Sequence, residues 1–420
     1  EHLDADTEMW MICEVQMLLR SATLVRTKMH EVYKVARAPT QEALDQDFSS
    51  YVRTFEAKEA FERAGITEFD LGCRDGLPAT VERLMQHQDT NALGRGLEIA
   101  ATYGRRACIE VLTAKQNQLT VHMLSSALRA VAKGDGQRDL GKLKERVVSA
   151  GMFPTDGRRS VVELEDELRS IIARRLLDGG AAVDAGDDQL RTSLYWACEH
   201  GYERVVEVLI SKGANVNAVE ATLGKTCLHG ASTGHVVELL CKAKADPGIV
   251  TTTNGRSALE YHASNNNVEP VQALIRAKAD VDQARPTGTT ALWMASSKGR
   301  TACVHLLLNA KANVEQGRKA GGGPLFVACQ KGHTEVVSML IAAKADLDRR
   351  KNDGVSPLCM ASYNGHAEVA GMMVDAGANY TNTSGGKSAV YWAKQRGHSE
   401  VVKVLLERIK LRERNQTHSQ

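Results

Sequence analysis

The fold is decided by a stretch that occurs twice in succession. Residues 324–346 read PLFVACQKGHTEVVSMLIAAKAD, and residues 357–379 read PLCMASYNGHAEVAGMMVDAGAN. The two copies start 33 residues apart, and Leu292 precedes the matching Leu325 by the same step. A fixed period of this length is typical of stacked repeats that have no single central core.

Seven phased copies of this pattern lie between residues 186 and 407. They share a turn that contains Gly, a Thr- or Ser-led start ending in Leu, and a second segment rich in Val and Leu. Small residues at Ala197, Ala295, Ala328 and Ala361 favour close approach of neighbouring helices. One such unit cannot bury its apolar face alone, so stability must come from stacking.

The pattern closely resembles the ankyrin repeat, in which a β-turn finger precedes two antiparallel helices. The resemblance implies an all-α repeat solenoid, an ankyrin-repeat array with short β-turn fingers and an N-terminal helical cap. Where four copies carry Lys instead of Gly after the second helix, we expect a left-handed backbone. These residues are Lys244, Lys278, Lys311 and Lys344.

The second copy is three residues short, and we expect a shortened loop near residues 233–236. Pro270 in the third copy should lie near the start of a helix, where Pro is tolerated. Histidines that follow the Gly between the two helices are expected to bond loop backbone: His235, His333, His366 and His398.

The chain is expected to have four parts. Residues 1–66 form an N-terminal helical region, which caps the array or docks a partner or a membrane surface. Residues 67–185 hold degenerate ankyrin-like repeats or other helical repeats, including a helix pair at 125–133 and 140–150. Residues 186–407 are the ankyrin repeats, and residues 408–420 form a polar, frayed C-terminal tail.

Bulk composition excludes several classes. The chain has 420 residues, with 53 basic and 51 acidic side chains and a net charge of +2, so only a local patch could attract a charged partner. Nine cysteines without a CxxC pair indicate reduced thiols. No apolar run is long enough to cross a bilayer. We expect an intracellular, cytoplasmic protein, with an organelle left open because the chain starts at Glu1.

The sequence contains no complete catalytic motif among those considered. Two Gly-Lys-Ser/Thr triplets resemble the end of a phosphate-binding loop, but Thr381 and Val219 stand where that loop needs Gly. The spacing of a Cys and His group does not match that of zinc sites: Cys227, His229, His235 and Cys241. We therefore expect no enzyme, cofactor, metal or small-molecule substrate; an enzyme hidden in the first 185 residues is the competing hypothesis.

In ankyrin families the partner meets the finger tips and the exposed positions before the inter-helix Gly. The resemblance implies a non-catalytic scaffold or adaptor, alone or within a larger complex. Most of the carried-over positions are basic, and they would form a basic stripe that attracts a protein with an acidic surface, unless they are only solvated turn residues. A nucleic-acid-associated scaffold using the same basic stripe is the alternative. Aromatics on the first helices are expected to pack between repeats. The expected partner-binding residues are Arg191, Lys225, Arg256, Arg285, Lys298, Arg318, Lys319, Lys331, Arg350, Lys351, Tyr363, Lys387 and Arg396.

Overall fold

The computed structural model describes residues 67–85, 88–114, 119–133, 161–319, 321–381 and 387–417. The predicted N-terminal region of residues 1–66 and the helix predicted at 140–150 lie outside these ranges. The chain divides into two compact units. One comprises Glu1–Asp187 and Ser211–Ala214, and the other comprises Asp188–Ile210 and Asn215–Gln420.

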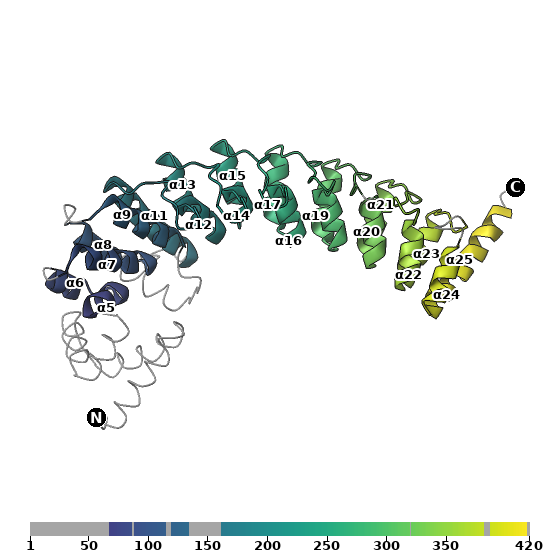
Figure 1. Cartoon of the computed structure of the whole chain (residues 1–420), viewed down its shortest axis with the longest axis horizontal. Helices are drawn as coiled ribbons and strands as arrows, with labels where there is room; N and C mark the ends of the chain where they lie inside the picture. Colours follow the sequence, from purple (N-terminus) through teal and green to yellow (C-terminus); the bar gives the residue numbers. More distant parts are fainter. Residues whose placement is uncertain are drawn as a thin grey trace, which may run out of the picture. The chain divides into compact units, whose positions relative to one another are not determined.

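The first unit is built from paired helices (Figure 1). Its helices are α5 (Glu68–Asp75), α6 (Pro78–Met85), α7 (Thr90–Thr102), α8 (Arg106–Thr113), α9 (Val121–Lys133) and α11 (Val161–Asp178). Helix α5 packs on α7 and α7 on α9, while α6 packs on α8. The buried guanidinium of Arg169 donates from Nη1 to the carbonyl of Val131, 2.9 Å away, which joins α11 to α9.

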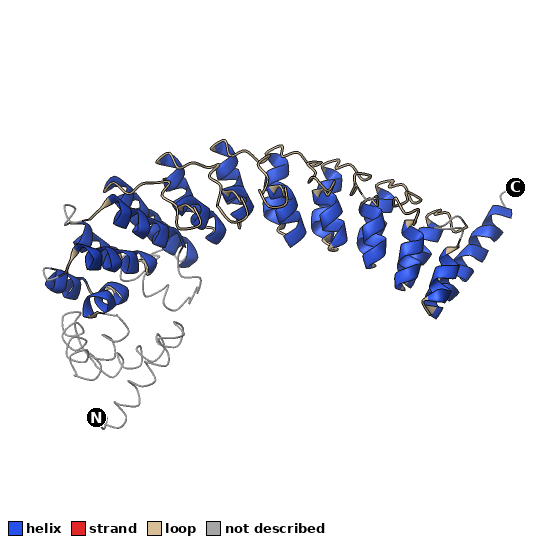
Figure 2. Ribbon diagram, in the orientation of Figure 1, coloured by secondary structure: helices blue, strands red, loops and turns tan. Residues whose placement is uncertain are grey.

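The second unit holds the regular repeats, and its described residues form helices and loops without an extended strand (Figure 2). The first helices of the repeats are α12 (Ser193–His200), α14 (Cys227–Gly230), α16 (Ala258–Asn265), α18 (Ala291–Ser297), α20 (Pro324–Lys331), α22 (Pro357–Asn364) and α24 (Ala389–Gln395). The second helices are α13 (Glu203–Ser211), α15 (Gly234–Lys242), α17 (Val268–Arg276), α19 (Thr301–Asn309), α21 (Thr334–Ala342), α23 (Ala367–Asp375) and α25 (Ser399–Thr417). First helices stack on first helices, and from α15 onward second helices stack on second helices. The all-α solenoid is therefore confirmed.

Repeated capping residues set the ends of the first helices. The hydroxyl of Thr290 accepts a hydrogen bond from the backbone N–H of Trp293, and Ser356 does the same for Cys359. At the other end, Gly332 and Gly365 adopt the left-handed conformation that ends a helix without a Cβ clash. Where both signals are present, as in α12 and α22, the Thr/Ser start and the Gly stop bound a helix of eight residues.

The four lysines after the second helices have the expected backbone. Their φ angles are 67° at Lys244, 61° at Lys278 and Lys311, and 62° at Lys344. The prediction of a left-handed conformation is confirmed. Pro270 lies at the third residue of α17, in its first turn, as predicted.

The prediction of a shortened loop in the second repeat is wrong, because the first helix absorbs the deletion. Helix α14 has four residues, whereas α16 has eight. The backbone N–H of Ser232 does not continue α14 but donates to the carbonyl of Cys198 in the preceding repeat, 3.0 Å away. The missing residues are therefore the last turn of a helix.

The expectation of a frayed tail is also wrong as far as residue 417, because α25 continues through residues 408–417. Arg408 pairs with Asp375 at 2.9 Å. Arg412 donates from Nη1 to the carbonyl of Ala378, 2.8 Å away, and from Nη2 to that of Gly377, 3.0 Å away. These contacts hold the extension of α25 against the end of α23.

Candidate protein-interaction face

Cations from the fingers, and Arg396 from the turn that ends α24, lie over aromatic rings of the first helices along the second unit. We call the surface formed by the fingers and the first helices the finger face. The distances from cation to ring centroid are 4.2 Å for Arg191–Trp196, 4.7 Å for Lys225–Tyr261, 5.1 Å for Arg256–Tyr261, 4.3 Å for Arg318–Trp293, 4.7 Å for Lys387–Tyr391 and 4.2 Å for Arg396–Tyr363. Such contacts orient the charges and lower the mobility of long side chains.

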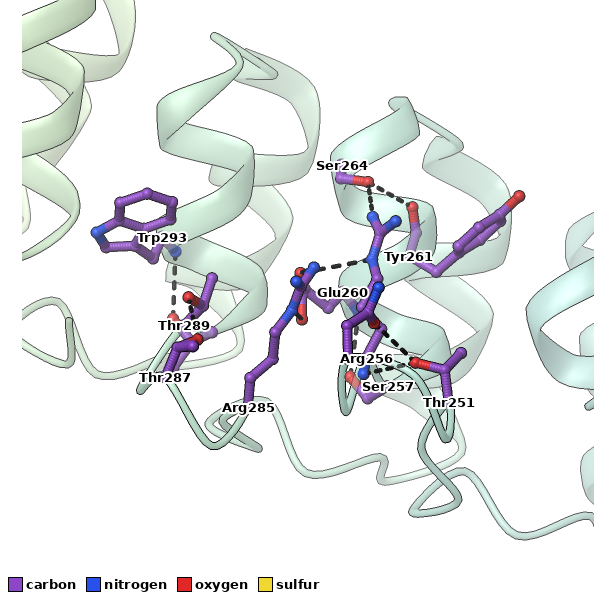
Figure 3. Close-up of polar contacts among 12 residues, drawn as sticks. Thr251, Arg256, Ser257, Glu260, Tyr261, Ser264, Arg285, Thr287, Thr289 and Trp293 are labelled. Carbon is purple, nitrogen blue, oxygen red and sulfur yellow. Dashed lines mark hydrogen bonds and ion pairs between the residues drawn. The ribbon is translucent and has the colours of Figure 1, made fainter. Parts of the chain in front are cut away.

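Two of the predicted cations are neutralised by a buried carboxylate (Figure 3). Glu260 on α16 is only 1% exposed and lies between Arg256 and Arg285. Arg285 donates to both carboxylate oxygens, with its Nε 2.7 Å from Oε2. Arg256 Nε lies 3.6 Å from Oε1, and its Nη2 donates to Ser264 Oγ. Burial lowers the pKa of Arg256, and the neighbouring Glu260 opposes that change. This cluster joins the third repeat to the next finger.

Farther along the array the predicted cations are exposed. Lys298, Lys319, Lys331 and Arg350 make no ion pair with any residue in the described ranges, and the exposed Arg318 lies over Trp293. Lys351 donates to Asp353 at 3.0 Å, and this hydrogen bond keeps the pKa of Asp353 below its usual range. Exposed positive charge thus runs through the fourth to sixth repeats and continues at Lys387 and Arg396 in the seventh.

The aromatic side chains divide into two groups. Trp196, Trp293 and Phe326 are buried, as expected for inter-repeat packing, and Trp293 Nε1 donates to the carbonyl of Gly322, 3.1 Å away, in the next finger. Trp392 also packs on a neighbouring repeat, with its ring centroid 5.8 Å from that of Tyr363, but Tyr391 and Trp392 are only half-buried beneath Lys387. Among the described residues, no further first helix stacks beyond α24 to cover them.

Three of the four turn histidines bond loop backbone. The Nε2 atoms of His333, His366 and His398 lie 3.2, 3.1 and 3.0 Å from carbonyl oxygens of the preceding repeat. His235 lies instead 3.9 Å from the Glu238 carboxylate, because α14 has lost its last turn. The described residues contain no group of three potential metal ligands.

Two features of this face were not predicted from the sequence. Glu260 was missed as the common counter-ion, although its position four residues after Arg256 on the turn and helix was a usable signal. The exposure of Leu190, described below, was also missed. Its place where other fingers have Gly was visible in the sequence.

Comparison with known families agrees with the geometry. A model for the ankyrin repeat matches residues 189–221, and a model for three copies of the ankyrin repeat matches residues 227–320 and 313–384. The chain is an ankyrin-repeat protein, and it carries a scaffold of the kind used for protein interaction. The matched residues begin at 189, so the ankyrin-like nature of residues 67–185 stays a prediction.

Relatives match in part of their length. The chain is 34% identical over 112 residues to ankyrin repeat domain-containing protein 63 of Mus musculus, covering 26% of this chain and 29% of the relative. It is 32% identical over 131 residues to the B-cell lymphoma 3 protein homolog of Mus musculus, covering 30% and 29%. Palmitoyltransferase AKR1 of Kluyveromyces lactis is 27% identical over 194 residues, covering 44% and 25%. The chain spans less than a third of the length of each of these relatives.

In the part of the chain that the structure describes, no helix combines the length and the hydrophobicity needed to span a bilayer.

Proposed function

We propose that this protein is a non-catalytic scaffold or adaptor whose finger face binds an acidic segment of another protein. The observation that carries the proposal is the arrangement of exposed cations at Lys298, Arg318, Lys319, Lys331 and Arg350 on consecutive repeats. A chain with a net charge of only +2 thus gathers positive charge on one face. Such a local field attracts carboxylates and speeds their association.

The ring contacts support the same function. Arg318 over Trp293 and Arg396 over Tyr363 are held by flat apolar surfaces rather than by carboxylates, so their donors stay available to a partner. Arg256 and Arg285 are different, because both pair with the buried Glu260: Arg285 donates to both of its carboxylate oxygens, and Arg256 forms an ion pair with it while donating to Ser264. We therefore assign recognition to the fourth to seventh repeats, and a structural role to the Glu260 cluster.

We infer that the protein acts inside the cell, in the cytoplasm. The eight described cysteines are unbridged, and seven of them are buried. Burial raises the pKa of Cys303 to about 11, which keeps its thiol protonated and unreactive. Unbridged thiols are typical of proteins in reducing compartments.

A triple charge reversal tests the proposal. In R318E/K319E/R350E we expect binding of a 20-residue peptide of alternating Glu and Ser to weaken by at least about tenfold at low salt, because three attractive pairs become repulsive. The matched control is K242E/K403E/K410E, which reverses three exposed lysines on second helices. Fluorescence anisotropy measures both.

Equal weakening in both triple variants would mean that only total charge matters, and it would contradict a specific face. A 20-nucleotide single-stranded RNA serves as the second probe. If the RNA bound more tightly than the acidic peptide at physiological salt and lost affinity in R318E/K319E/R350E, the nucleic-acid alternative would replace the proposal.

A further inference from the structure

A leucine stands where the other described fingers have glycine. Gly224, Gly255, Gly288 and Gly354 occupy this turn with φ between 67° and 83°, a region that glycine adopts freely. Leu190 holds the same turn with φ of 57°. For a bulky L-residue this conformation is strained. The Leu190 side chain is 60% exposed, so little contact within the fold compensates for the strain.

Neighbouring fingers add apolar side chains beside Leu190. Val219, Leu223 and Val250 are 39%, 42% and 37% exposed. Four of the eight large hydrophobic side chains that are exposed in the described residues therefore lie on three consecutive fingers. We call Leu190, Val219, Leu223 and Val250 the apolar tip patch. A cluster of this kind marks a contact surface more strongly than scattered single residues do.

Main-chain hydrogen bonds hold the three tips together. The N–H of Ala221 donates to the carbonyl of Gln189, 2.8 Å away, and the N–H of Thr252 donates to the carbonyl of Leu223, 3.0 Å away. The apolar tip patch is thus pre-organised, so a partner need not order the fingers when it binds.

The two fingers at residues 219–224 and 250–255 expose no charge at their tips. Their one carboxylate, Glu220, is buried and accepts hydrogen bonds from the N–H groups of Thr222 and Leu223, at 2.7 and 2.6 Å. Covering these tips therefore removes no exposed charge from water. The tips of the later fingers carry Arg318, Lys319 and Arg350, so apolar and basic surfaces follow each other along one face.

We propose that the apolar tip patch and the basic tips at Arg318, Lys319 and Arg350 form one bipartite site for a single extended protein segment. Its apolar side chains contact the patch, and its carboxylates contact the cations. The proposal rests on the proposed function and adds the apolar half of the partner. Successive helix layers are about 10 Å apart, and 20 extended residues reach about 66 Å, so one short segment can span both halves.

Two 20-residue peptides test this site. The mixed peptide has alternating Glu and Ser in one half and alternating Leu and Ser in the other, and it is made with the halves in both orders. The acidic peptide has Ser in place of every Leu and so carries the same charge. We expect the better order of the mixed peptide to bind wild-type protein at least about fivefold more tightly, as burial of one or two leucines would give.

L190G is the diagnostic variant. Because glycine relieves the strained turn, we expect its denaturation midpoint to rise, so lost binding cannot reflect unfolding. L190G should remove most of the mixed peptide's advantage and leave binding of the acidic peptide unchanged. L411S removes an exposed leucine on α25 and should change the affinity for neither peptide.

The outcomes separate the two proposals. The apolar half is overturned if the mixed and acidic peptides bind wild-type protein with equal affinity, or if the advantage of the mixed peptide survives in L190G. The acidic site is still supported in that case if R318E/K319E/R350E weakens the binding of both peptides. The opposite result is that the triple variant changes the affinity for neither peptide while L190G abolishes the leucine-dependent advantage. That result would support the apolar tip patch and contradict the acidic site.

Discussion

At the residue scale, single positions carry backbone strain for different reasons. Lys244, Lys278, Lys311 and Lys344 end second helices in a left-handed conformation that glycine would adopt without a Cβ clash. Their side chains are exposed, so the strain is not offset by burial. Leu190 shares this conformation, but it lies at a finger tip beside other apolar residues. At the lysines, the strained backbone therefore lowers stability that a glycine would restore. At Leu190, the strained backbone coincides with the proposed contact surface.

Replacing any one of the four lysines by glycine should stabilise the protein. We expect each Lys→Gly variant to raise the free energy of unfolding by roughly 0.5–1 kcal/mol, because the turn no longer requires a Cβ in left-handed space. Urea denaturation followed by circular dichroism measures the change. Lys403→Gly, inside α25, is the control and should lose about 1 kcal/mol. A lower midpoint in all four test variants would show that the left-handed turns do not limit stability.

At the element scale, the shortened α14 and the side chain of His262 fit each other. His262 lies on α16 where other first helices have the small residues Ala295, Ala328 or Ala361. It is buried, and its Nε2 donates to the carbonyl of Leu228 in α14, 2.8 Å away, while Nδ1 accepts from Asn267. A lost helical turn in one repeat is thus accompanied by a larger, hydrogen-bonded side chain in the next.

This junction should make the array sensitive to acid. Burial lowers the pKa of both His229 and His262 to about 4, and nearby Arg256 adds to the shift. The unfolded chain, with a histidine pKa near 6.5, binds more protons between pH 6.5 and 4. Stability is therefore fully present above pH 6.5 and falls as the pH drops toward 4, by up to roughly 3 kcal/mol per histidine.

His262→Gln tests the origin of this pH dependence. We expect the variant to lose less stability than wild type between pH 6.5 and 4 in denaturant titrations, because one titrating group is gone. His305→Gln removes an exposed histidine on α19 and should keep the wild-type profile. Identical profiles for all three proteins would assign the acid sensitivity to other groups.

At the scale of the whole molecule, the second unit works as a linear surface. Each repeat contacts its neighbours, so side chains that are distant in sequence lie in a row along the array. Such a row can bind a partner without a central pocket. The uncharged tips at residues 219–224 and 250–255 and the basic tips of the later fingers lie along this row. On the proposed bipartite site, a partner would be distinguished by the order of its apolar and acidic residues as well as by its charge.

The two halves of the site should separate in binding kinetics. Charge attraction acts before contact, so R318E/K319E/R350E should lower mainly the association rate of the mixed peptide, and the difference from wild type should shrink as salt is raised. Loss of a short-range apolar contact acts after docking, so L190G should raise mainly the dissociation rate. Stopped-flow fluorescence between about 50 and 500 mM salt measures both rates. A salt-independent association rate would contradict electrostatic steering.

The sequence by itself determined the solenoid, the left-handed lysines and the positions of the finger cations, because each depends on a local pattern repeated every 33 residues. Only the tertiary structure decided which cations stay available, since Glu260 meets Arg285 from the next repeat, 25 residues away. It also decided that the deletion shortens α14, and that the apolar tips lie together. These outcomes depend on packing between neighbours, which a repeat period does not encode.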